Sequence, residues 1–347
     1  MKTGRTLQEL ATELDRQNKT KKDYLAKTTA LELYPLQSGG VKLGGINGGM
    51  TVRSIAHQHI ASHTGIPKVY YDRLLADAPD LLAENVNHWF SSNPTNRLVR
   101  TLDSSVRAFL SDSYRPLDNY DLAEAVLPRL QKLNAHVVSA EVTENRFYLK
   151  AITDKISGEV KQGDLIQAGL VISNSEVGQG SLRVEAMDYR LICTNGMIRE
   201  SAVRKAHLGR SGSRGQDAIE DAREFFRDET RQADDRAFFL KVQDAVTAMF
   251  DAKTFNLRLN QYREAAEIVI DADPVESVRE ISTQLKLTDG EQKGVLAHLI
   301  RGSDLSVWGM ANAVTRTAAD SEDYDRATEL ESAGAKVLEM PRSVWGK

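Results

Sequence analysis

The feature that most constrains the fold is a change of hydrophobic period in the middle of the chain. Apolar residues recur at helical spacing before residue 97 and after residue 216, whereas they alternate with polar residues over much of 97–197. The runs 137–142 and 147–151 predict one hairpin, and 165–176 with 181–193 predict a second, longer one. We therefore predict an α+β fold with a central antiparallel sheet, long hairpins and packed helices, followed by an all-helical C-terminal part.

The chain has 347 residues, more than a single hydrophobic core usually holds, so we expect several parts. Residues 1–95 predict an N-terminal helical arm, including a mobile basic stretch at 19–27, and a helix cluster. Residues 96–215 predict the central sheet core with a helix over 119–133. Residues 216–347 predict a long acidic helix to about Phe250 and four shorter ones starting near Leu257, Pro274, Glu291 and Ser306.

None of the motifs that usually carry chemistry is convincing here. The glycine-rich stretch 39–49 predicts turns or a hairpin, and no Gly-Lys-Ser/Thr follows to make a phosphate-binding loop. His59 and His63 lie four residues apart beside His57, but a zinc site needs further ligands that the sequence does not offer. Cys193 lies in an apolar strand pattern typical of a buried thiol. We expect no catalytic residues, no metal and no cofactor.

A helix-turn-helix is a weaker possibility for residues 54–75, where two short helices flank Gly65-Ile66-Pro67. The second of these helices would offer only Lys68 and Arg73 to nucleic acid. Plain helix packing is therefore the preferred interpretation.

Charge is distributed unevenly, although 45 Lys and Arg against 49 Asp and Glu leave a net charge of only −4. Residues 183–214 hold seven basic and three acidic residues, whereas 217–251 hold ten acidic and five basic ones. Basic side chains near strands could neutralise the phosphates of a single strand, with tyrosines against its bases. The alternative is an ordinary solvated face. The candidate phosphate contacts are Arg97, Arg100, Arg107, Arg115, Arg183, Arg190, Arg199, Arg204 and Lys205.

Several separated motifs resemble a phage- and plasmid-associated family known as domain of unknown function 932. They are the segments SYRPLDN at 113–119, ISNSEVG at 172–178, YRLICTNGM at 189–197 and WGMANAVT at 308–315, together with Gly65-Ile66-Pro67. The resemblance covers nearly the whole chain and implies a mobile-element context. The family has no assigned activity.

The predicted order of helix, curved antiparallel sheet and helix is also similar to the eukaryotic strand-annealing recombinase superfamily, whose members form rings. This similarity implies ATP-independent binding of single-stranded DNA and strand annealing, as a recombination mediator acting as a homo-oligomeric ring or filament. Annealing needs little covalent chemistry, because a basic groove need only hold one strand by its phosphates.

Two other functions stay open. One is a protein-binding or anti-defence module of a mobile element that uses the acidic helical third, and the other is a metal-dependent nuclease. We expect a cytoplasmic protein with no membrane association, because the single cysteine suits a reducing compartment and no apolar run is long enough to span a bilayer.

Overall fold

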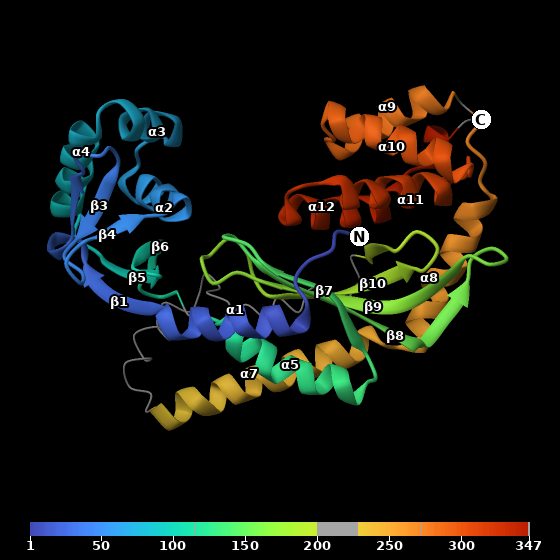
Figure 1. Cartoon of the computed structure of the whole chain (residues 1–347), viewed down its shortest axis with the longest axis horizontal. Helices are drawn as coiled ribbons and strands as arrows, with labels where there is room; N and C mark the ends of the chain where they lie inside the picture. The colour runs from blue at the N-terminus through green and yellow to red at the C-terminus, as the bar shows by residue number, and fades with distance from the viewer. Residues whose placement is uncertain (115, 200–227, 272, 346–347) are drawn as a thin grey trace. The chain divides into compact units, whose positions relative to one another are not determined.

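The computed structural model describes residues 1–114, 116–199, 228–271 and 273–345 (Figure 1). The described chain packs into two compact units, and each unit is discontinuous in sequence. Unit 1 comprises Met1–Leu10, Asp121–Asn174 and the described part of Ser181–Lys347. Unit 2 comprises the described part of Ala11–Tyr120 together with Ser175–Gly180, a short segment from between two strands of unit 1.

Unit 2 contains a six-stranded sheet in the order β1-β5-β6-β4-β3-β2. All neighbouring strands are antiparallel except β4 and β6, which are parallel. The strands are β1 (Lys22–Lys27), β2 (Glu32–Pro35), β3 (Val41–Gly44), β4 (Met50–Val52), β5 (Asn96–Leu102) and β6 (Ser105–Ser111). The helices are α2 (Ser54–Thr64), α3 (Lys68–Asp77) and α4 (Pro79–Ser92). α1 (Leu7–Thr20) leads into β1.

The core of unit 2 forms where these helices pack on one face of the sheet. Phe90 of α4 stacks on Phe109 of β6, with ring centroids 5.5 Å apart. Gly65 ends α2 in the left-handed conformation at φ 71°, which a residue without Cβ adopts at little cost. The Gly65-Ile66-Pro67 segment therefore turns the chain between two packed helices.

Unit 1 contains a five-stranded antiparallel sheet in the order β11-β10-β9-β8-β7. Its strands are β7 (His136–Val142), β8 (Phe147–Glu159), β9 (Leu165–Asn174), β10 (Arg183–Arg190) and β11 (Asn195–Arg199). Its helices are α5 (Asn119–Lys132), α7 (Asp228–Met249), α8 (Ala252–Glu267), α9 (Pro274–Leu285), α10 (Asp289–Gly302), α11 (Val307–Thr317) and α12 (Tyr324–Val337).

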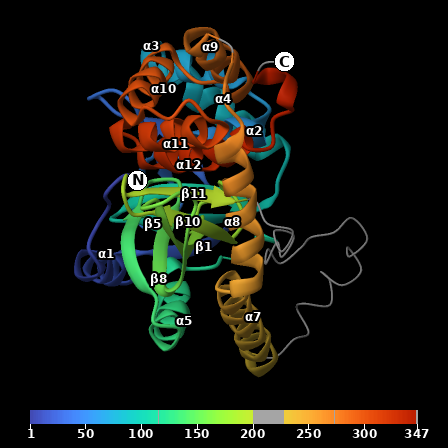
Figure 2. The same ribbon diagram turned by 90° about the vertical axis from the view of Figure 1, so that its right-hand side faces the viewer.

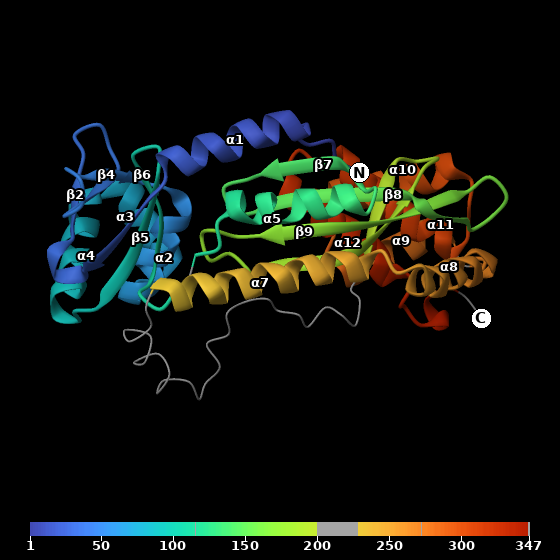
Figure 3. The same ribbon diagram turned by 90° about the horizontal axis from the view of Figure 1, so that it is seen from below.

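Helices cover both faces of the unit 1 sheet. α5 and α7 run side by side along one face, as Figure 3 shows, and α11 and α12 lie over the other (Figure 1). α8 rises beside the strands toward the C-terminal helices (Figure 2). Side chains on both faces of β9 are accordingly buried, and its burial is nearly continuous from Ala168 to Asn174.

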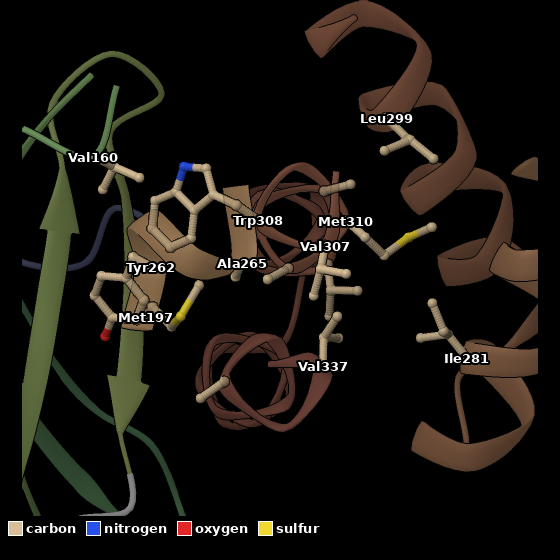
Figure 4. Packing of buried hydrophobic residues seen from close by; sticks show 14 of the residues in the cluster. Val160, Met197, Tyr262, Ala265, Ile281, Leu299, Val307, Trp308, Met310 and Val337 are labelled. Carbon is tan, nitrogen blue, oxygen red and sulfur yellow. The ribbon is translucent and has the colours of Figure 1, made fainter. Parts of the chain in front are cut away.

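The largest apolar cluster of unit 1 joins the sheet to the C-terminal helices. Figure 4 shows Trp308 and Tyr262 packed between Val160 and Met197 of the sheet region and the helices beyond. The Trp308 and Tyr262 rings stack with centroids 4.8 Å apart. α11 is buried along nearly its whole length, because it packs against α8, α10 and α12 as well as the sheet.

The predicted α+β class, the two hairpins and the helical C-terminal part are confirmed. Two details were wrong. The basic stretch expected to be a mobile arm is largely the strand β1, and the helical third contains α12 in addition to the four shorter helices expected after the long one. The three-part division at residues 95 and 215 stays a prediction, although β5 and β6 share a sheet with β1–β4. The segment 216–227 lies outside the described residues.

No helix among the described residues combines the length and apolar character needed to cross a bilayer.

Candidate functional site

The nine predicted phosphate contacts are distributed over both units. Arg97, Arg100 and Arg107 belong to unit 2, and Arg183, Arg190 and Arg199 belong to unit 1. The remaining three, Arg115, Arg204 and Lys205, lie outside the described residues. The surroundings of the six described arginines differ sharply.

Arg100 lies in β5 with only 1% of its surface exposed, and every branch of its guanidinium group has a protein acceptor. Nε donates to Asp23 Oδ1 at 2.9 Å and Nη2 donates to Asp118 Oδ1 at 2.7 Å. Nη1 donates to the backbone oxygen of Glu176 at 2.8 Å. Arg100 therefore ties β1, the segment before α5 and the Ser175–Gly180 segment together within unit 2.

Arg107, the next predicted contact along the chain, is buried against the carboxylate of Glu176. Its Nη2 donates to Glu176 Oε2 at 2.5 Å, and the backbone N–H of Asn119 donates to Oε1 at 2.6 Å. Nearby, Tyr114 donates its hydroxyl hydrogen to the backbone oxygen of Ser175 at 3.1 Å. We call Arg100, Arg107, Asp118, Asn119 and Glu176 the Glu176 cluster.

The electrostatics of this cluster follow from burial and from the number of opposite charges. Burial alone would raise the pKa of Asp118, but the charge of Arg100 and hydrogen bonds from Arg100 and Lys21 lower it overall. Burial alone would lower the pKa of Arg100, yet Asp23 and Asp118 raise it. Both groups are thus held charged, and removing one would leave the other buried without a counter-ion.

Arg97 is in a different position, half-buried beside two histidines of α2. Its guanidinium carbon lies 5.1 Å from the centre of the Phe109 ring, and its Nε is buried with no hydrogen-bond partner. Burial lowers the pKa of Arg97. Burial and the charge of Arg97 also lower the pKa of His59 and of His63. Burial and the neighbouring Arg97 therefore both favour the neutral form of the two imidazoles.

In unit 1, Arg190 at the end of β10 is engaged by a carboxylate. Nε and Nη2 donate to the two oxygens of Asp164 at 2.5 and 2.8 Å, and the Trp308 indole N–H donates to Oδ2 at 2.9 Å. Although burial works to lower the pKa of Arg190, the bond to Asp164 raises it. This group anchors α11 to the sheet.

A second buried carboxylate, Asp188, lies two residues earlier in β10. Arg258 of α8 donates to both of its oxygens at 2.7 and 2.8 Å, and the Tyr262 hydroxyl donates to Oδ2. Burial first, and then the charge of Asp188, raise the pKa of Tyr262 well above its ordinary value. Arg199 lies on the same face of the sheet as Asp188. Its guanidinium carbon is 5.7 Å from the centre of the Tyr262 ring, and its Nη2 donates to Gln261 Oε1.

Arg183 and Arg199 lie on opposite faces of the unit 1 sheet. Arg199 pairs with Ala186, three residues along β10 from Arg183, and successive strand residues alternate in direction. Arg183 is exposed and makes no ion pair with any described residue, whereas Arg199 is half-buried with one nitrogen lacking a partner. Within this sheet, the two arginines do not form one continuous track.

Sequence reasoning missed the acidic partners that decide what the arginines do. Glu176 and Asp118 lie inside two of the quoted motifs, and Trp308 begins a third. The motif at 189–197 meets the last one where Asn195 donates to Asn312 Oδ1 at 3.2 Å. One signal was available in the sequence: the motifs 113–119 and 172–178 each hold a single acidic residue. An isolated acidic residue of this kind is compatible with a buried ion pair.

The arrangement offers hydrogen bonds and paired buried charges. Across the described residues, no three His, Cys, Asp or Glu side chains gather closely enough to hold a metal ion. His57, one of the three histidines of the sequence cluster, is buried with its Nδ1 2.9 Å from the Tyr71 hydroxyl. Burial lowers the pKa of His57 to about 4.

Comparison with known protein families gives one match. Residues 108–336, about two thirds of the chain, match the family described as Domain of unknown function (DUF932). The chain belongs to this family. The match includes Asp118, Asn119 and Glu176 of the Glu176 cluster, as well as Asp164, Asp188 and α11, and it begins one residue after Arg107. Searches of curated proteins and of solved structures find no match.

Proposed function

We propose that this member of the DUF932 family binds single-stranded DNA and anneals complementary strands without ATP, as a recombination mediator of a phage or plasmid. The support is the concentration of basic residues in 183–214, where seven basic residues oppose three acidic ones. Neutralising phosphates with such residues releases counter-ions, which gives affinity without sequence preference. Annealing then requires only that the bases stay accessible to a second strand.

The proposal rests on fewer residues than the sequence suggested. Arg100, Arg107 and Arg190 already have carboxylate partners inside the protein, so we leave them out of the binding surface. Arg199 leaves it as well, because it lies on the sheet face opposite Arg183 and donates to Gln261. Arg183 and the basic residues of 200–214 remain in it. The latter lie outside the described residues and enter through their charge alone.

Fluorescence anisotropy of a labelled oligothymidine, measured at several salt concentrations, tests the binding step. We expect affinity to fall steeply with salt, and the slope of log affinity against log salt to decrease by about one for each phosphate contact removed, as in Arg183→Ala. Arg279→Ala is the matched control, because Arg279 is an exposed arginine of α9 outside the basic segment. No binding at low salt, or binding that salt does not weaken, would contradict the proposal.

Annealing is tested separately with two complementary oligonucleotides that carry a fluorophore and a quencher. Addition of the protein without ATP should speed quenching, and replacing Arg204, Lys205, Arg210 and Arg214 together by Gln should slow it. If the protein binds DNA without accelerating quenching, it is a single-strand binder and the annealing step is wrong.

A second function, protein binding, is favoured by apolar side chains that unit 1 leaves in solvent. Val269, Ile300 and Leu305 are 59%, 65% and 44% exposed. Val269 and Leu305 lie close together, because Ile270, the residue after Val269, donates its N–H to the Leu305 backbone oxygen at 2.9 Å. Exposed apolar side chains that lie together mark protein interaction sites, whereas single ones are ordinary. A stoichiometric host protein recovered by a chain that has no affinity for DNA would select this function.

A further inference from the structure

The strand β1 is an uncovered edge of the unit 2 sheet. It pairs with β5 on one side only, and among the described elements it packs extensively against no other. Leu25, at its centre, is 67% exposed. Tyr24 and Ala26 point the other way, into the core under α2–α4. A six-residue edge with an exposed apolar centre is a template for pairing with another strand.

The register with β5 determines which backbone groups of β1 are available. Thr28, the first residue after the strand, begins a short 3-10 helix and donates its N–H to the Thr95 backbone oxygen at 2.9 Å. Extending the β1–β5 register by one residue places Thr28 opposite Thr95, so the two form a hydrogen-bonded pair. Hydrogen-bonded pairs alternate along an antiparallel ladder. The backbone N–H and C=O groups of Asp23, Leu25 and Lys27 therefore point away from β5, toward the open edge.

Two other edge strands of the described structure are covered. At β2, the far edge of the same sheet, the Asn87 side chain accepts from Leu33 N at 2.7 Å and donates to Leu33 O at 2.8 Å. At β7, the edge of the unit 1 sheet, Arg5 donates its N–H to the backbone oxygen of Ala140. Among the described residues, none covers the exposed centre of β1 in this way.

We propose that β1 pairs with β1 of a second copy of this chain, antiparallel and centred on Leu25. In this register Leu25 faces Leu25 of the partner across a two-fold axis, and Asp23 faces the partner's Lys27 at both ends. Asp23 Oδ1 accepts from Arg100 of its own chain, so the lysine of the partner pairs with the second carboxylate oxygen. The outward backbone groups of all three residues then hydrogen-bond, and the two six-stranded sheets become one. The opposed charges and the apolar centre are the cross-strand pairs that stabilise antiparallel strands.

Charge selects this register among those that use the same outward groups. Centring on Asp23 would place Asp23 opposite its own copy, and centring on Tyr24 would place Lys27 opposite Lys21. Centring on Ala26 leaves Asp23 opposite Thr29 with no charge pair. Like charges directly opposite each other destabilise a ladder, so only the Leu25 register is self-complementary.

The proposal is independent of DNA binding, because β1 contributes none of the basic residues assigned to DNA above. A two-fold contact of this kind closes at two copies. A ring or filament would need a second, different contact in addition. Lysines at edge strands also commonly prevent pairing, and a monomer is therefore the competing outcome.

Sedimentation equilibrium of the full chain over a range of protein concentrations tests the pairing. We expect a dimer whose dissociation constant rises by about tenfold or more in Lys27→Glu, which places Glu opposite Asp23, and in Leu25→Lys, which places two lysines face to face. Val69→Lys is the matched control, because Val69 is an 85% exposed residue of α3 in the same unit. It should leave the dissociation constant unchanged.

A cross-link identifies the register. In a Cys193→Ala background, Leu25→Cys should form a disulfide-linked dimer under mild oxidation, because Cα atoms of a hydrogen-bonded pair lie about 5.5 Å apart, within disulfide range. Val69→Cys should not. A chain that is monomeric at every concentration, or a dimer that both β1 substitutions leave intact, overturns the proposal. Circular dichroism and loss of DNA binding report separately on folding and on the proposed function.

Discussion

At the scale of single residues, the molecule's buried charges act as structural ties. Asp188 is 2% exposed, and its two carboxylate oxygens accept hydrogen bonds from Nε and Nη2 of Arg258. Such a pair contributes little compared with an apolar pair of the same volume, but losing one partner leaves the other charged, buried and unsatisfied. The pair therefore has a large effect on the free energy of unfolding only when one of its two partners is replaced.

Asp188→Asn should accordingly lower the free energy of unfolding of unit 1 by about 3 to 5 kcal/mol, because Arg258 stays buried without a counter-ion. The double variant Asp188→Leu with Arg258→Met should recover most of that loss. Urea unfolding followed by tryptophan fluorescence is a suitable measurement, because Trp308 stacks on Tyr262 beside the pair. The exposed pair Glu276–Arg279 provides the control, and Glu276→Gln should cost less than about 1 kcal/mol. If Asp188→Asn and Glu276→Gln lower the free energy of unfolding equally, the Asp188–Arg258 pair is not a buried tie.

A pH dependence follows from His57, whose pKa burial lowers from 6.5 to about 4. Between these values the unfolded chain binds a proton that the folded chain does not, so stability falls as the pH decreases through this range. One such group contributes a slope of up to about 1.4 kcal/mol per pH unit.

The variant His57→Gln lacks this group, so the stability difference between it and the wild type should shrink from pH 7 to pH 4.5. Urea unfolding at a series of pH values measures this difference. His88→Gln, at an exposed position of α4, serves as the control for the replacement of a histidine by glutamine. A difference for His57→Gln that stays constant with pH would show that His57 is not kept neutral by the fold.

At the scale of elements, the Asn87 side chain covers the edge strand β2 of the unit 2 sheet. The Asn87 amide makes both hydrogen bonds that a neighbouring strand would make to Leu33. Asn87→Ala leaves the Leu33 N–H and C=O without these partners and should cost about 1 to 3 kcal/mol. It should also increase aggregation, because it opens a second edge.

Thermal unfolding and light scattering on heating measure these two effects of Asn87→Ala. The matched control is Asn85→Ala on the same helix, since the Asn85 side chain donates to the Leu81 backbone oxygen of its own helix. If both variants behave alike, the amide does not act as an edge cover.

The same scale shows what the sequence could predict. The two hairpins of the unit 1 sheet and α5 follow from local periodicity and turn residues, and the structure confirms them. The unit 2 sheet was not recognised, because β4 and β6 pair in parallel across the whole α2–α4 segment and no local pattern encodes that. Arg100 and Arg107 read as surface charges because their partners, Asp118 and Glu176, are set by tertiary contacts.

At the scale of the whole molecule, the chain order and the packing order differ. The segment Ser175–Gly180 is joined in sequence to β9 and β10 but belongs to unit 2. There Gly178, at φ 74°, lies so close to Leu110 that an added Cβ would come within 2.8 Å of it. Glu176 of this segment supplies the buried carboxylate for Arg107. Unit 2 therefore cannot be completed by residues 11–120 alone.

Glu176→Gln tests whether the two units have separate stabilities. The substitution removes the charge that compensates Arg107, so unit 2 should lose about 3 to 5 kcal/mol while unit 1 keeps its own core and ion pairs. Hydrogen exchange read by mass spectrometry should show faster exchange in β1, β5 and β6 and unchanged exchange in β7–β9. Asp188→Asn is the reciprocal control, because it should speed exchange in unit 1 alone. If either substitution speeds exchange equally everywhere, the units unfold as one cooperative body, and the Glu176 cluster stabilises the whole molecule instead of unit 2.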